Sequence, residues 1–163
     1  GRKKTQVAKE RVLSIAPHCD VTAMDLFYTS QTAECIDFTA FDYVIDAIDT
    51  MTSKIDLICR ATRAGTPIIS SMGTGNKLDP TKLRVTDLYK TQGCPMARIL
   101  RRELKKRNVP RLKVVFSEEE PKKVTVPDEN TTRHAPGSVV FVPACAGLML
   151  ASEAVRDLTR GYQ

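Results

Sequence analysis

The 163-residue sequence predicts one α/β domain, residues 1–163, with three layers in which helices cover both faces of an open parallel sheet. Residues 43–45, Tyr-Val-Ile, form an apolar run without polar alternation, as a strand buried on both faces requires. A helical pattern and a second apolar run, residues 67–72, follow it. This order predicts a right-handed strand, helix, strand unit with parallel strands.

The first third of the chain predicts a helix, a strand and a helical turn. Residues 4–16 repeat apolar side chains on one helix face and are followed by Pro17, which ends helices. Residues 19–26 alternate and predict a short strand, and residues 29–37 predict one or two helical turns. An α/β domain normally opens with a strand and a glycine-rich phosphate loop, which are absent before this helix. We therefore expect a sheet that lacks its first nucleotide-binding strand, turn and helix.

The rest of the chain predicts alternating strands and helices. Gly65 is a suitable C-terminal residue for the helix after the central strand, and Pro95 is a suitable first residue for a later helix. A charged, Pro- and Gly-containing stretch, which includes His134, predicts a long surface excursion. In order, the predicted segments are a helix over 53–64, strands over 67–72 and 83–88, a helix over 95–107, a strand over 112–116, the excursion over 118–138, a strand over 139–142 and a helix over 144–160.

Two carboxylates, Asp46 and Asp49, follow the central strand and precede a helix. Ligands of open α/β sheets bind at the carboxyl ends of the strands, and a helix N-terminus adds a partial positive charge there. The pair therefore suits magnesium or a polar ligand. Asp is also common in turns and caps, so both residues can instead be ordinary turn residues.

Two other segments are expected near that edge. Residues 73–77 contain Gly73 and Gly75 but match neither G-x-x-x-x-G-K-[ST] nor G-x-G-x-x-G, so a plain loop is the alternative to a ligand loop. Cys94 precedes a helix N-terminus close to many cations, which makes it the best candidate nucleophile of the sequence. The alternative role for Cys94 is a buried or capping thiol.

The helix over 95–107 has a strongly basic face. Only Glu103 opposes its cations, and Arg111 follows nearby. Such a ridge can bind phosphates, although a solvated helix face is the alternative. The formal net charge of +6 is consistent with a nucleic-acid partner. The candidate nucleic-acid-binding residues are Arg98, Arg101, Arg102, Lys105 and Lys106.

Composition excludes several classes of protein. No apolar run reaches the length of about 18 residues that a membrane span needs, and residues 1–16 do not resemble a signal peptide. The 5 cysteines are odd in number and include no C-x-x-C pair, which argues against a disulfide framework and a zinc knuckle. We therefore expect a cytoplasmic protein without a membrane partner.

Three segments carry a family resemblance: VIDAIDTMTSK, GTGNKLDPTKLRVTDLYKT and CPMARILRRELKK, in this order. Together they resemble the tRNA threonylcarbamoyladenosine dehydratase branch of the ThiF/MoeB/HesA superfamily, the adenylating enzymes related to ubiquitin-activating enzymes. GRKKTQVAKERV and PGSVVFVPACAGLMLASEAV resemble the family's helix after the nucleotide loop and its closing strand and helix. The resemblance thus extends over nearly the whole chain.

The resemblance implies a Rossmann-like homodimer that binds ATP and magnesium and acts on tRNA. It implies adenylation of the threonyl carboxylate of threonylcarbamoyladenosine, followed by cyclisation with loss of AMP. Lys4 matches the lysine that contacts ATP phosphates, and Asp49 matches the catalytic aspartate that positions magnesium. Asp46 matches a neighbouring cofactor-binding position. Absence of paired C-x-x-C motifs favours the dehydratase branch over adenylators of sulfur-carrier proteins, which remain the alternative.

The family's glycine-rich loop, acidic ribose contact and arginine-bearing segment all precede the position that matches Gly1. The resemblance therefore implies the C-terminal part of a ThiF-like adenylating domain, with little or no adenylating activity alone, whether as a fragment or as a natural truncation. A non-catalytic RNA- or protein-binding module is a further alternative. A sulfur-transfer protein is a possible partner, and nothing specific supports a nicotinamide-dependent oxidoreductase.

Overall fold

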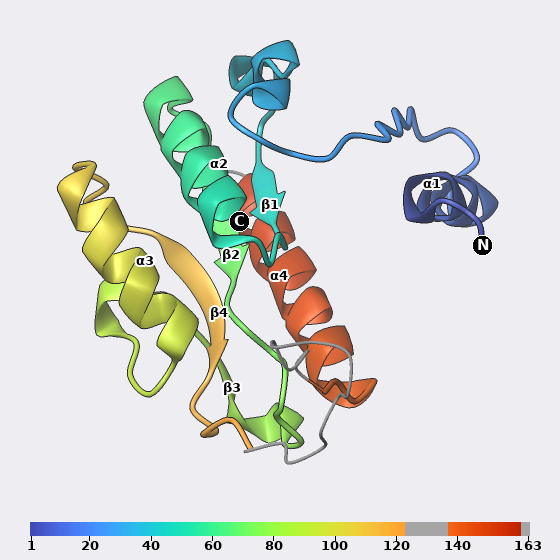
Figure 1. The fold of residues 1–163 in the computed structure, drawn as a ribbon. Coiled ribbons are helices and arrows are strands. Elements are labelled where there is room, and N and C mark those ends of the chain that lie inside the picture. The colour runs from blue at the N-terminus through green and yellow to red at the C-terminus, as the bar shows by residue number, and fades with distance from the viewer. Residues whose placement is uncertain (123–136, 161–163) are drawn as a thin grey trace. The chain divides into compact units, whose positions relative to one another are not determined.

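The computed structural model describes residues 1–122 and 137–160, in two compact units that divide at Cys35 and Ile36 (Figure 1). The first unit opens with helix α1, Lys4–Ile15, as predicted. The Ala16 amide donates to the Val12 carbonyl at 2.8 Å and Pro17 follows, so the helix stops where its sequence requires.

The predicted strand over residues 19–26 is wrong. These residues follow α1 as irregular chain without a ladder partner among the described residues. Alternation of side chains is not sufficient for a strand, because its backbone groups need a hydrogen-bonded neighbour. The helical turn predicted over 29–37 is present as the short 3₁₀ segment η1, Thr32–Cys35, and a second 3₁₀ segment, η2 Phe38–Ala40, follows beyond the predicted range.

The second unit contains a sheet of four strands in the order β1-β2-β4-β3. β1 pairs with β2 and β2 pairs with β4 in parallel, whereas β3 runs antiparallel to β4. The sheet is therefore mostly parallel, as predicted. Its strands are β1 Val44–Asp46, β2 Ile68–Ser71, β3 Leu83–Asp87 and β4 Lys113–Ser117, and the 3₁₀ segments η3 Pro80–Lys82 and η4 Leu88–Lys90 flank β3.

Helices cover both faces of this sheet, which gives the three predicted layers (Figure 1). α2, Met51–Ala64, and α3, Pro95–Lys106, cover one face, and α4, Phe141–Thr159, covers the other. Neighbouring residues of β4 point to opposite faces, so Val114 enters the core under α2 and α3 while Val115 enters the core under α4. The central strands are thus buried on both sides.

The helix ends follow their local sequence. Gly65 caps α2 with a φ of 75°, in the left-handed region that glycine adopts without a Cβ clash. Pro95 is the first residue of α3, where its missing N–H costs nothing.

The strand predicted over residues 139–142 is wrong, because Phe141 and Val142 begin α4. Val142 is buried together with Ala146 and Leu150, at a helical spacing of four residues. The apolar run therefore belongs to the helix that follows it. Of the excursion predicted over 118–138, residues 123–136, with His134, lie outside the described residues. Within the part of the chain that the structure describes, no helix is long and apolar enough to span a membrane.

Candidate functional site

The carboxyl ends of β1, β2 and β4 meet at one edge of the sheet, since these three strands are parallel. β1 ends at Asp46, β2 ends at Ser71 and β4 ends at Ser117. The loop after β1 leads directly into α2, and Met96 in the first turn of α3 lies beside Gly73 in the loop after β2. The N-termini of both helices therefore direct partial positive charge towards this edge. This edge is the ligand side of an open α/β sheet.

Asp46 is buried and holds four elements of this edge together. Its Oδ2 accepts hydrogen bonds from Lys54 Nζ at 2.7 Å and Ser70 Oγ at 2.6 Å, and its Oδ1 accepts from the Ile48 amide at 2.9 Å. Asp46 and Ser70 are register partners on neighbouring strands, which brings their side chains to the same face. The carboxylate of Asp46 is therefore engaged by the protein itself, and its predicted role in cofactor binding stays a prediction.

Lys54 completes this buried cluster. Its ammonium also donates to the Ile48 carbonyl at 2.9 Å, so one side chain of α2 contacts both the end of β1 and the loop after it. Burial lowers the pKa of Lys54, and the negative charges of Asp46 and Asp49 oppose that shift. The carboxylate of Asp46 therefore supplies the charge that keeps a buried ammonium stable in this place.

Asp49 lies in the loop that this cluster holds, directly before α2, and is exposed. Its Oδ1 accepts a weak hydrogen bond from the Thr50 hydroxyl at 3.4 Å, which leaves most of its lone pairs available. Within residues 1–122 and 137–160, no three His, Cys, Asp or Glu side chains form a metal cluster. Asp49 can thus contribute one carboxylate to magnesium, whose other ligands would be substrate phosphates and water.

Lys4 is the first residue of α1 and is exposed. It belongs to the first unit, whereas Asp49 belongs to the second. The predicted contact of Lys4 with ATP phosphates therefore stays a prediction.

A second buried lysine, Lys77, lies in the glycine-containing loop after β2. Its Nζ donates to the Ser117 carbonyl at 3.1 Å, which ties this loop to the end of β4. Burial lowers the pKa of Lys77, against the opposing influence of Cys94 and Glu119. Cys94 is itself buried as the N-cap residue of α3. Burial fits the alternative given above for Cys94 better than an accessible nucleophile.

Sequence reasoning missed Lys54 and Lys77. A signal existed for Lys54, because it lies on the helix face that Ile58 and Ala61 continue at i+4 and i+7. A lysine in line with an apolar face is a candidate for a buried ion pair. No comparable signal marks Lys77, since its burial depends on the Ser117 carbonyl of a distant strand.

The basic face of α3 is present and its members differ in their contacts. Arg98, Arg102, Lys105 and Lys106 are exposed. Arg101 is instead half-buried and donates to the Thr91 carbonyl at 2.8 Å and to the Thr91 hydroxyl. Arg101 therefore fixes the loop before α3, which leaves the four exposed cations to meet a partner.

Glu103 neutralises part of this face. Hydrogen bonds from Arg107 and Lys106 lower its pKa to about 2, and Arg102 contributes less. Within the described part of the chain, Arg98 and Lys105 form no ion pair. The face therefore keeps a positive charge that solvent or a polyanion must balance.

Together, the parallel sheet, its covered faces and the polar carboxyl edge define a Rossmann-like α/β protein. The chain matches the model of the ThiF family over residues 1–161, and it belongs to this family.

Relatives and solved structures agree with this assignment. The tRNA threonylcarbamoyladenosine dehydratase of Bacillus subtilis is 38% identical, over 100% of this chain and 68% of that protein. The tRNA threonylcarbamoyladenosine dehydratase 2 of Saccharomyces cerevisiae is 38% identical, over 82% of this chain and 32% of that protein. The crystal structure of Escherichia coli tRNA N6-threonylcarbamoyladenosine dehydratase in complex with AMP matches with a TM-score of 0.83 and 31% identity, over 99% of this chain and 66% of that one. The ATP complex of the same enzyme matches with a TM-score of 0.82.

Proposed function

We propose that this protein acts in the ATP-dependent adenylation and dehydration of threonylcarbamoyladenosine in tRNA. The observation that carries the proposal is Asp49, an exposed carboxylate at the ligand edge and at the N-terminus of α2. Family membership and the names of the relatives support the substrate class. The chain spans 66% of the E. coli structure, so the activity of a whole enzyme is part of the proposal.

The reaction has two steps that the charges of this edge suit. In the first, an oxygen of the threonyl carboxylate bonds to the α-phosphorus of ATP, and pyrophosphate leaves. In the second, an atom of the carbamoyl group bonds to the acyl carbon and closes a ring, while the bond between that carbon and the oxygen of AMP breaks and AMP leaves. Asp49 would hold magnesium against the phosphates, and Lys4 would add an ammonium to them. Asp46 and Lys54 would keep the Asp49 loop in place.

The exposed cations of α3 support tRNA as the partner. α3 begins at the ligand edge and carries the exposed cations Arg98, Arg102, Lys105 and Lys106. A nucleic acid bound along α3 would therefore extend to the edge where Asp49 lies. Contacts of this kind depend on charge and carry no sequence information. Recognition of the modified base would therefore come from the edge itself. Cytoplasmic location is part of the same proposal.

The role of Asp49 is tested with Asp49→Asn in a chimera that joins this chain to the part of the B. subtilis relative that it does not match. Loss of the carboxylate should reduce ATP–pyrophosphate exchange with modified tRNA by about a hundredfold or more, because the loss of even an outer-shell partner of a metal costs about 10- to 100-fold. Asp42→Asn, at another exposed aspartate, is the matched control and should retain activity.

Normal turnover by the Asp49→Asn chimera would contradict the assignment. The chain without the added part is assayed beside it. We expect little or no exchange from it, in line with the expectation from the resemblance.

The role of α3 is tested by the salt dependence of tRNA binding. Replacing both Arg102 and Lys105 with alanine should weaken binding and lower the slope of log K against log salt by about 1 to 2 units, because each phosphate contact contributes nearly one unit. Arg84→Ala, which removes an exposed cation from β3, is the control. If the two α3 substitutions leave the slope unchanged, α3 is only a solvated face.

We further propose a homodimer that uses the outer face of α4. Phe141, Leu148 and Val155 are exposed on this helix at intervals of seven residues. Ala144, Ala151 and Leu158 lie between or beside them, also exposed, in alternating steps of three and four. Apolar residues at this spacing form the seam of paired helices, and a second copy carries the same seam.

A further inference from the structure

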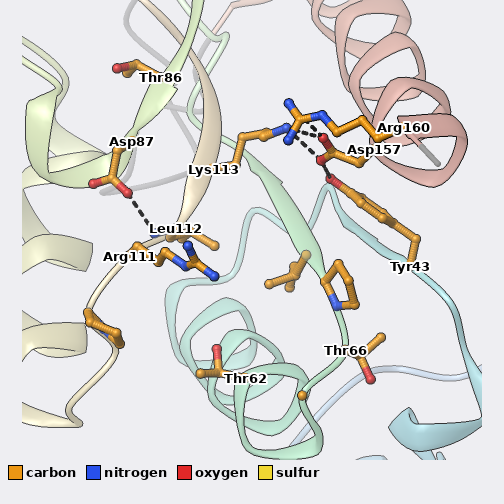
Figure 2. Close-up of a pocket in the computed structure, with 14 residues that line it drawn as sticks. Tyr43, Thr62, Thr66, Thr86, Asp87, Arg111, Leu112, Lys113, Asp157 and Arg160 are labelled. Carbon is orange, nitrogen blue, oxygen red and sulfur yellow. Dashed lines mark hydrogen bonds and ion pairs between the residues drawn. The ribbon is translucent and has the colours of Figure 1, made fainter. Parts of the chain in front are cut away.

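A hollow of about 650 Å³ lies at the edge of the sheet opposite to Asp49 (Figure 2). Tyr43 precedes β1, Pro67 and Ile68 open β2, and Lys113 opens β4, so the hollow lies at the amino ends of the parallel strands. The C-terminal ends of α2 and α4 contribute Gly65 and the residues around Asp157. No step of the proposed reaction uses this hollow.

The two carboxylates of the hollow already accept hydrogen bonds from other groups of the protein. Asp157 accepts hydrogen bonds from Lys113 Nζ at 2.6 Å and from the Tyr43 hydroxyl at 2.8 Å, and Arg160 lies at 3.4 Å (Figure 2). Burial alone would raise the pKa of Asp157, but the hydrogen bonds from Lys113 and Tyr43 lower it. The Asp157 carboxylate is therefore charged and fully engaged.

Asp87, on the opposite wall, is engaged by the backbone. Its two oxygens accept from the Tyr89 amide at 2.8 Å and the Leu112 amide at 3.1 Å. The carboxylate thus fixes the turn after β3 to the start of β4, and it has no cation as a partner among the described residues.

Arg111 is the cation of the hollow that has no such partner. Its side chain extends from the segment before β4 into the hollow (Figure 2). It is exposed, and within the described part of the chain it forms no hydrogen bond or ion pair. A guanidinium presents a planar fork of donors that matches the oxygens of a phosphate.

A second hollow connects this one to the basic face of α3 only through a shared lining residue, Pro110. Pro110 lines it and also lines a smaller hollow of about 420 Å³, whose wall includes Lys105 and Tyr89. Arg111 thus lines one hollow and Lys105 the other, and Pro110 lines both. α3 has 12 residues and is about 18 Å long, so its exposed cations extend from the ligand edge to this opposite edge.

We propose that Arg111 and this hollow bind a phosphate group of the RNA and so extend the RNA-binding face of α3 to the amino edge of the sheet. The inference rests on the proposed function. A single free phosphate is a poorer occupant, because the C-terminal ends of α2 and α4 direct partial negative charge towards the hollow. The other phosphates of an RNA strand would contact the cations of α3, so the RNA would hold one phosphate in the hollow. A free phosphate lacks those additional contacts and would be repelled.

The test compares tRNA binding by the whole chain and its variants across a range of salt concentrations. Arg111→Ala should weaken binding and lower the salt slope by about 1 unit, as for the loss of one phosphate contact. Arg111→Lys keeps the charge without the fork, so it should keep the slope and bind more weakly. Arg84→Ala, which also removes one exposed cation, should keep the same salt slope of tRNA binding as the parent protein. Inorganic phosphate titrated alone, followed by NMR shifts at residues 110–113, should produce no saturable change.

Each outcome decides one point. An unchanged slope in Arg111→Ala, with a reduced slope in Arg102→Ala, would overturn the inference and leave the RNA face of α3 intact. Saturable phosphate binding at Arg111 without any effect on tRNA would overturn RNA as the occupant. Failure of every form to bind tRNA would contradict the proposed function itself.

Discussion

Asp46 and Asp49 lie three residues apart and occupy different environments. Asp46 is 1% exposed and bonded to Lys54, Ser70 and the Ile48 amide, whereas Asp49 is exposed beside the N-terminus of α2. Desolvating a carboxylate is costly unless its lone pairs and its charge are satisfied. At the scale of single residues, the buried aspartate stabilises the fold and the exposed one remains available to a metal.

Removing the partner of Asp46 should destabilise the protein strongly. Lys54→Met leaves the carboxylate buried without its cation, and the loss of such a partner typically costs about 3 to 5 kcal/mol. The free energy of unfolding in urea measures the loss. Arg156→Met removes an exposed cation paired with Glu153 and should cost about 1 kcal/mol or less.

The double variant Lys54→Met with Asp46→Asn should recover part of that stability, because it removes the unpaired charge as well. If Lys54→Met costs no more than Arg156→Met, the buried ion pair does not hold the edge together.

The sequence could place both aspartates at the end of a strand but could not separate their roles. Burial of Asp46 depends on Ser70, which is 24 residues away and becomes its neighbour only through the register of β1 and β2. Spacing along one chain does not carry that information. Arg101 is similar, because its bond to Thr91 depends on the path of the loop before α3.

The helices show where local sequence is decisive. The predicted boundaries of α2 and α3 agree with the structure to within two residues, since Gly65 and Pro95 act through their own backbone geometry. Residues 139–142 were ambiguous in principle, because a short apolar run fits a strand or a buried helix. Residues 19–26 needed a neighbouring strand, which their own pattern cannot supply.

The C-cap of α2 and the interior of α4 predict opposite effects of two Gly→Ala substitutions on the free energy of unfolding. Gly65→Ala places a Cβ at a φ of 75°, where nothing lies within 4 Å, so only backbone strain acts and should cost about 1 kcal/mol. Gly147→Ala lies inside α4, also with open space around it, and should stabilise by up to about 1 kcal/mol. Urea unfolding of both variants checks the pair. If both substitutions change the free energy of unfolding in the same direction and by a similar amount, an added Cβ does not strain the C-cap of α2.

At the scale of the whole molecule, the outer face of α4 predicts self-association. Leu148 is 71% exposed at the centre of the apolar stripe, and Leu148→Glu would place a charge opposite its own copy. We expect the variant to sediment as a monomer at concentrations where the parent is a dimer. Ile99→Glu, at an exposed position on α3, should leave the parent's sedimentation unchanged. A monomeric parent would contradict the dimer directly.

The three-layer architecture was predictable because each strand that is buried on both faces needs cover from two sides. The strand order was not predictable in the same way. β4 enters between β2 and β3, so the central position of residues 113–117 follows from pairing between distant segments. The resemblance supplied the chemistry of the edge, and the helix face of Lys54 carried a signal of its burial. Lys77 and the amino-end hollow depend instead on contacts between segments that are distant in the sequence.

The bond between Tyr43 and Asp157 joins the beginning of the sheet to its last helix, 114 residues apart. During synthesis, β1, β2 and β4 leave the ribosome before α4, so the face that holds Ile69 and Val115 has no cover until α4 has been made. A nascent chain in that state exposes apolar surface of the kind that chaperones bind. Synthesis of α4 is therefore the step that covers this apolar face.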